Sequence, residues 1–241
     1  MFFKKKFNIH SETIFRSIVI FGVFLFLFLS FNVISLVSQE TVSNSKEYLP
    51  IIILDAGHGG EDGGASSDDG ILEKDINLKI ALKLRDMLNL SGFDVKMTRD
   101  KDISIYDQSA KSVREQKVSD LKNRLAMVNE NTNNILLSIH QNKFTQSKYF
   151  GTQIFYSENN PKSFEIADKI KTSVVKLTQP DNTRETKPGK DIFLLSQTQN
   201  PAVIVECGFL SNPDEAAKLN SNDYQQQLAF AIYCGFLQAL Q

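Results

Sequence analysis

Short apolar runs alternate with longer amphipathic stretches from Pro50 to the end of the chain. Six runs have strand length, and the Ile- and Val-rich ones are typical of strands buried on both faces of a sheet. These runs are residues 51–56, 94–99, 134–140, 152–157, 191–195 and 202–207. Four longer stretches repeat apolar residues every three or four positions, which predicts amphipathic helices. These stretches are residues 75–90, 118–130, 163–177 and 224–240.

Strands that alternate with helices predict an α/β fold. We expect a single domain whose twisted, mostly parallel sheet is covered by helices on both faces. Residues 100–116 and 179–190 lack periodic apolar positions and are predicted to be loops. In open sheets of this kind, binding and catalytic groups lie outside the carboxyl ends of the strands.

The first 49 residues do not follow this pattern. Lys4, Lys5 and Lys6 precede residues 17–39, which contain no charged side chain. A membrane-spanning helix needs about 20 apolar residues, whereas the apolar part of a signal peptide has about 7–15. The length therefore favours an uncleaved membrane anchor over a cleaved signal peptide, and both place the remaining chain outside the cytoplasm. We divide the chain into an anchor or signal segment (1–39), a polar tether (40–49) and a globular domain (50–241).

The charge balance excludes one class of partner. The chain has 27 basic and 28 acidic side chains and a formal net charge of -1. Nucleic-acid-binding domains carry a basic patch, and none is present here. Cys207 and Cys234 both lie in apolar surroundings and are expected to be buried thiols that take no part in metal binding.

The histidines suggest a metal site. Of the three in the chain, His58 follows one predicted strand and His140 ends another, while Glu206 ends a third. Catalytic zinc sites commonly use three protein ligands from His and carboxylate side chains and leave one position for water. His58 and His140 can supply two ligands. The residue types leave four acidic candidates for the third: Asp55, Glu61, Asp62 and Glu73.

The glycine-rich stretch around His58, AGHGGEDGGA, has a competing interpretation as a phosphate-binding loop. It contains neither the P-loop pattern nor the dinucleotide-binding glycine pattern. Its carboxylates would also repel a phosphate group. A bound cation therefore suits this stretch better than a nucleotide.

Four motifs then occur in order along residues 51–241: DAGHGGEDGGA followed by GILEKDINL, then TRD, SIHQN and PAVIVECGFLSN. With them the sequence resembles the zinc-dependent N-acetylmuramoyl-L-alanine amidases of the Amidase_3 type. The hydrophobic N-terminal segment and KVSDLKNRL make it similar to the sporulation, or CwlD-like, subgroup. The resemblance implies that residues 50–241 are a zinc amidase domain with one Zn²⁺ on His58, Glu73 and His140 and with Glu206 as the catalytic carboxylate. It thus selects Glu73 among the four acidic candidates.

The resemblance also implies a biological role. The expected reaction is hydrolysis of the amide between N-acetylmuramic acid and L-alanine in peptidoglycan. Similarity to the CwlD-like subgroup implies a role in spore cortex formation by the muramic-lactam pathway and in germination. It also implies that the catalytic domain lies outside the membrane, for example in the forespore intermembrane space, and that the protein is either membrane-anchored or secreted. An accessory activator protein is an expected partner. Asn142, Arg99 and Arg184 are candidates for substrate contacts.

Three alternatives stay open at this point. The first is an amidase of the vegetative cell wall, and the second is a zinc peptidase that cleaves bonds within the stem peptide. The third is a non-catalytic, membrane-tethered protein that only binds the wall. The residues His58, Glu73, His140 and Glu206 argue against the third, because binding alone needs no general base.

Overall fold

The structure, a computed structural model, describes residues 14–30 and 49–241. The chain divides into two units, Met1–Leu49 and Pro50–Gln241. In the first unit, residues 14–30 form a helix whose apolar side chains are exposed. Among the described ranges, no helix has the length and apolar character needed to cross a membrane. The predicted membrane segment extends to residue 39, and its second part lies outside the described residues.

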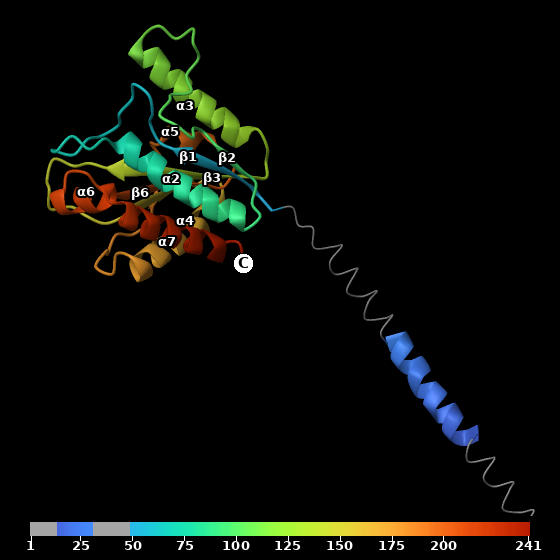
Figure 1. The fold of residues 1–241 in the computed structure, drawn as a ribbon. Coiled ribbons are helices and arrows are strands. Elements are labelled where there is room, and N and C mark those ends of the chain that lie inside the picture. Colours follow the sequence, from blue (N-terminus) through green and yellow to red (C-terminus); the bar gives the residue numbers. More distant parts are fainter. Residues whose placement is uncertain (1–13, 31–48) are drawn as a thin grey trace, which may run out of the picture. The chain divides into compact units, whose positions relative to one another are not determined.

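The second unit alternates strands and helices along the chain (Figure 1). Its strands are β1 (Ile51–Ala56), β2 (Val95–Met97), β3 (Asn134–Asn142), β4 (Gln153–Tyr156), β5 (Lys187–Pro188) and β6 (Ala202–Phe209). Its helices are α2 (Glu73–Leu90), α3 (Val113–Asn129), α4 (Pro161–Leu177), α5 (Phe193–Gln197), α6 (Pro213–Asn220) and α7 (Asn222–Gln238).

One sheet of six strands organises this unit, in the order β2-β1-β3-β6-β4-β5. The pairs β1–β2, β1–β3, β3–β6 and β4–β5 are parallel, whereas β4 and β6 run antiparallel. The α/β prediction is thus confirmed, with a mixed sheet rather than a wholly parallel one. The neighbouring strands β1, β3 and β6 within this order each contain a run of three or four consecutive apolar residues.

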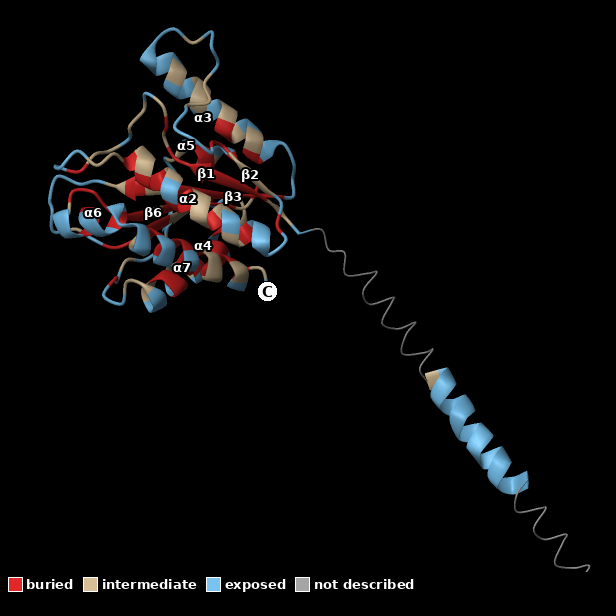
Figure 2. Cartoon of the chain, in the orientation of Figure 1, coloured by how far each residue is buried: buried red, intermediate tan, exposed pale blue. Residues whose placement is uncertain are grey.

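Helices cover both faces of the sheet, as predicted. The larger core packs α2, α4, α6 and α7 against one face, where Ile52, Leu54 and Val205 are fully buried. The smaller core packs α3 and α5 against the other face, around Ile53 and Leu136. Figure 2 shows the strands buried between helices whose outer surfaces are exposed.

Four elements differ from the sequence-based prediction, and one of them is the two-residue strand β5, which lies inside the predicted loop 179–190 and pairs with β4. Residues 191–195 were expected to form a strand, but α5 is a short helix there, and Leu194 and Leu195 lie in the smaller core. A short apolar run fits either a strand or a buried helix turn, and periodicity cannot distinguish them. Helix α3 begins at Val113, inside the predicted loop, with a capping box between Ser112 and Glu115. Helix α6 was not predicted, although Asn212 caps it and Pro213 opens it.

The alternation of side chains along the central strands positions the polar residues. On the face covered by α3 and α5, the buried positions Ile53, Leu136 and Ile204 belong to the smaller core. Two residues further along β1 and β6, the same face presents Asp55 and Glu206. His140 pairs in register with Glu206, so their side chains leave the sheet on the same side. The apolar core therefore gives way to ionisable groups at the carboxyl edge of this face.

Candidate metal centre

The loop after β1 presents His58 in a conformation that most residues avoid. Its φ of 62° lies in the left-handed region, where a residue other than glycine is strained. Glycines allow the chain to pass close to the other polar groups. A Cβ at Gly57 would lie 2.2 Å from Nε2 of His140, and a Cβ at Gly64 would lie 2.6 Å from Oε2 of Glu73. The glycines around His58 therefore serve close packing in this loop, as the absence of a phosphate-binding pattern suggested.

Glu73 is the first residue of α2, and only 3% of it is exposed. Its Oε2 accepts a hydrogen bond of 2.8 Å from the backbone N–H of Ala65, and its Oε1 accepts one of 3.1 Å from that of Gln141. Oε1 also lies 3.0 Å from Nδ1 of His140 and 3.3 Å from Nε2 of His58. Burial alone would raise the pKa of Glu73, but the two imidazoles outweigh it and hold the pKa well below its usual range.

Three potential ligand atoms thus converge from separate elements. One ligand atom each from His58, Glu73 and His140 lies within 4.8 Å of the others. The two imidazole rings meet edge to face, with centroids 5.0 Å apart. Two imidazole nitrogens and one carboxylate oxygen are a donor set of catalytic zinc sites, which leave a further position for water. The residues present therefore fit a zinc ion, and the other acidic candidates do not join this group.

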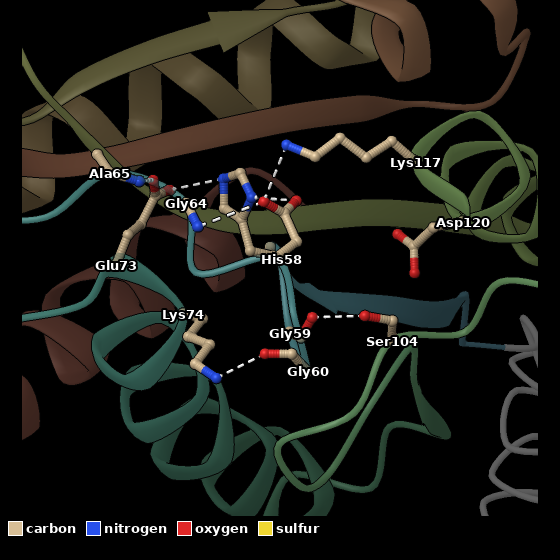
Figure 3. A network of polar contacts seen from close by, with 12 residues as sticks. His58, Gly59, Gly60, Gly64, Ala65, Glu73, Lys74, Ser104, Lys117 and Asp120 are labelled. Atoms are coloured by element: carbon tan, nitrogen blue, oxygen red, sulfur yellow. Dashed lines mark hydrogen bonds and ion pairs between the residues drawn. The ribbon is translucent and has the colours of Figure 1, made fainter. Parts of the chain in front are cut away.

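A hydrogen bond at Nδ1, the ring nitrogen that does not face Glu73, orients the ring of His58. Nδ1 of His58 donates to Oδ2 of Asp62 at 2.8 Å, which leaves Nε2 as the nitrogen that faces Glu73. Lys117 of α3 lies 3.2 Å from the other oxygen of Asp62. His58 accordingly lies between Glu73 and the end of the Lys117 side chain (Figure 3). Burial would lower the pKa of His58, but its contacts with Glu73 and Asp62 raise it to about 9.

Asp62→Asn is expected to weaken zinc binding about 10–100-fold, the usual cost of removing a carboxylate that supports a metal-bound histidine. The amide keeps the shape of the side chain but loses the charge that favours an N–H at Nδ1 of His58. Competition with a chelator of known affinity would measure the effect. Glu61→Gln, at the exposed neighbouring residue, is the matched control. Equal affinity of the Asp62 and Glu61 variants would contradict this supporting role.

Glu206 lies beside the three potential ligands without bonding to them. Its Oε2 is buried and has no hydrogen-bond partner within the described part of the chain. Burial raises the pKa of Glu206 to about 7, with Glu73 adding to the effect and the two histidines opposing it. A buried carboxylate oxygen without a hydrogen-bond partner costs free energy unless a ligand or a water molecule bonds to it. A carboxyl group with this pKa can accept a proton and return it near neutral pH, as a general acid–base group does.

A cavity of about 540 Å³ opens beside these groups. His58 and His140 form one part of its lining, and α3 contributes Val113 and Leu121 to another. The cavity is large enough for part of a substrate, since ligand pockets commonly measure about 300–1,000 Å³.

Asp55, one of the four acidic candidates, has a structural role instead. It is fully buried, accepts hydrogen bonds from Thr98 (2.8 Å) and Ser138 (2.5 Å), and pairs with Arg124 of α3. Burial would raise its pKa, but Arg124 and the other contacts lower it to about 2. Arg124 was not singled out from the sequence, because a single arginine on an amphipathic helix carries no distinguishing signal.

The three candidates for substrate contacts differ in position. Arg99 is 2% exposed, and its guanidinium donates to the backbone carbonyls of Ala56, Gly57 and Lys74, so it supports the loop. Asn142 ends β3 and is half-buried. Arg184 donates to the carbonyl of Phe150 (2.7 Å) and stacks 4.4 Å above the ring of Phe209. Contacts of Arg99, Asn142 and Arg184 with substrate stay predictions.

Comparison with known proteins gives consistent matches over the second unit. The family model for N-acetylmuramoyl-L-alanine amidase, Amidase_3, matches residues 52–238. The germination-specific N-acetylmuramoyl-L-alanine amidase of Bacillus subtilis is 33% identical over 222 residues, which cover 87% of this chain and 91% of the relative.

Solved structures agree with these matches. The CwlD amidase from Clostridioides difficile, in complex with the GerS lipoprotein, is 43% identical with a TM-score of 0.77, over 79% of this chain and 98% of that one. The catalytic domain of the amidase CwlV from Bacillus (Paenibacillus) polymyxa is 28% identical with a TM-score of 0.66, over 79% and 98% of the two chains.

Proposed function

We infer the chemistry of the site from the premise that this chain belongs to the Amidase_3 family of N-acetylmuramoyl-L-alanine amidases. The protein is an N-acetylmuramoyl-L-alanine amidase that acts on peptidoglycan. We propose that it works with one zinc ion held by His58, Glu73 and His140, and that Glu206 is its catalytic carboxylate. The observation that carries the proposal is that one ligand atom from each of these three residues lies within 4.8 Å of the others. Glu206 of β6 pairs in register with His140 of β3 beside this group.

When bound, zinc would lower the pKa of a water molecule and polarise the carbonyl of the scissile amide. Glu206 would accept the proton of the water that attacks this carbonyl carbon. It would then pass the proton to the nitrogen of L-alanine as the carbon–nitrogen bond breaks. The products are the lactyl carboxylate of N-acetylmuramic acid and a stem peptide with a free L-alanine amine. The buried Oε2 of Glu206 suits this use, because it has no hydrogen bond within residues 14–30 and 49–241 that would have to be broken first.

Mass spectrometry of muropeptides tests the bond that is cleaved. Peptidoglycan treated with the zinc-loaded, full-length protein is expected to gain free lactyl carboxylates and stem peptides that begin with L-alanine. New ends within the stem peptide would instead indicate the zinc peptidase considered above. Binding without any released fragment would favour the wall-binding protein.

We further propose that the substrate is the spore cortex and that the enzyme acts in cortex formation by the muramic-lactam pathway and in germination. The support is the similarity to the germination-specific amidase and to CwlD. Deleting the gene in the native host and comparing the muropeptides of purified spores and of growing cells would separate this role from that of a vegetative wall amidase. A change confined to growing cells would contradict the cortex role.

Three further proposals concern the location of the enzyme, its N-terminal segment and its protein partner. The domain acts outside the cytoplasmic membrane, where peptidoglycan lies, in the forespore intermembrane space for a cortex enzyme. The N-terminal segment anchors the domain or directs its secretion. An accessory protein assists it, as the complex of CwlD with the GerS lipoprotein suggests. Fractionation of cells would test the location and the role of the N-terminal segment, and copurification from the native host would test the accessory protein.

A further inference from the structure

Arg99, in the TRD motif just after β2, takes no part in the reaction described above. In the described part of the chain its guanidinium donates only to backbone carbonyl oxygens. Burial, together with the neighbouring charge of Arg124, lowers the pKa of Arg99. Burying a charged group costs free energy, and hydrogen bonds to the group offset that cost.

Three of the four carbonyl acceptors of Arg99 belong to the two segments that carry proposed metal ligands, and the fourth is the carbonyl of Lys101. Nε donates to the carbonyl of Ala56 at 2.8 Å, and Nη2 donates to that of Gly57 at 3.0 Å, directly before His58. Nη2 also donates to the carbonyl of Lys74 at 2.8 Å, directly after Glu73. One planar group thus joins the loop that carries His58 to the first turn of α2.

Packing and neighbouring hydrogen bonds strengthen this connection. A Cβ at Gly59 would lie 2.8 Å from Cδ of Arg99, so the loop lies directly on the arginine stem. Arg124 donates to the carbonyl of His58 at 2.9 Å from the α3 side. The left-handed backbone of His58 is of the kind that persists only where surrounding contacts hold it.

We propose that Arg99 is a positioning residue that fixes the separation of His58 and Glu73, so that the metal-free protein already presents both ligands. The inference rests on the proposed zinc site. A guanidinium offers several donors in a rigid plane, whereas a lysine ammonium is a single flexible point and cannot replace all these contacts at once. Without Arg99, the loop and the start of α2 can move apart, and zinc binding then has to order them.

The test is the zinc affinity of full-length Arg99→Gln and Arg99→Lys proteins, measured by competition with a chelator. Arg85→Gln is the matched control, because Arg85 lies on α2 and pairs with Asp86 on the surface. We expect Arg99→Gln to bind zinc about 10–100-fold more weakly, in the range found for residues that support metal ligands. Arg99→Lys is expected to fall between Arg99→Gln and the parent, and Arg85→Gln to match the parent.

Denaturant unfolding of the zinc-free proteins separates positioning from general stability. A purely structural Arg99 would lower the free energy of unfolding but leave the zinc affinity of the folded protein unchanged. Parental zinc affinity in a folded Arg99 variant would therefore overturn the inference. Arg99→Lys, which keeps the charge, decides the matter if Arg99→Gln does not fold. If the unaltered protein binds no zinc, the proposed metal site itself fails.

Discussion

Glu206→Gln is expected to lower the rate of amide hydrolysis by about 10²–10⁴-fold, the usual contribution of a general acid–base group. Glutamine has nearly the same shape, but it cannot accept the proton of the attacking water. Because Glu206 lies outside the group of three potential ligands, zinc affinity should not change. Single-turnover hydrolysis of purified muropeptides, with zinc content measured on the same samples, gives both quantities.

Glu185→Gln is the control for this experiment, since Glu185 is an exposed glutamate whose side chain pairs only with Lys171 in the described residues. It should hydrolyse the substrate at the parental rate. A Glu206→Gln protein that is zinc-loaded and fully active would show that another group moves the proton. Loss of zinc together with activity would instead place Glu206 among the metal ligands.

Glu73→Gln is expected to weaken zinc binding by more than about 100-fold, the upper end of the cost of losing a supporting residue, because Glu73 itself supplies a ligand. The change removes the negative charge that lies near both imidazoles, at 3.0 Å and 3.3 Å. The amide oxygen can still accept the hydrogen bond from the backbone N–H of Ala65, so of the two backbone hydrogen bonds only the one from Gln141 is lost and the fold should survive. Chelator competition and activity at rising zinc concentration would measure the loss.

Asp68→Asn provides the comparison, because Asp68 is an exposed carboxylate in the same loop. It should bind zinc as the parent does. If the Glu73 variant kept parental zinc affinity, the third ligand would have to be sought elsewhere, with Asp62 as the nearest carboxylate to His58.

The fold was largely predictable because the strands that hold the site contain short, consecutive apolar runs. β1, β3 and β6 have buried side chains on both faces, and each contains a run of three or four consecutive apolar residues. The short helix α5 was missed because five residues are too few to show a helical period. The antiparallel pairing of β4 with β6 was not predicted, because the sequence of a strand does not indicate the direction of the strand beside it.

The site was predictable in its residue types but not in its supporting contacts. His58, His140 and Glu206 stand at strand ends, and parallel strands bring such ends together. The choice of Glu73 came from family resemblance, because four acidic residues near His58 were chemically equivalent in the sequence. The positioning role proposed for Arg99 could not be predicted, because its partners are backbone carbonyls up to 43 positions away. Every residue has such a carbonyl, so the residue types do not reveal which ones Arg99 contacts.

The most direct test of the proposed centre is a crystal structure of the zinc-loaded protein with diffraction data collected on both sides of the zinc absorption edge. We predict one anomalous peak at about 2.0–2.2 Å from Nε2 of His58, a carboxylate oxygen of Glu73 and Nδ1 of His140, with Glu206 unbound. A peak that lacks Glu73, includes Glu206 as a ligand, or lies away from the two histidines would contradict the proposal.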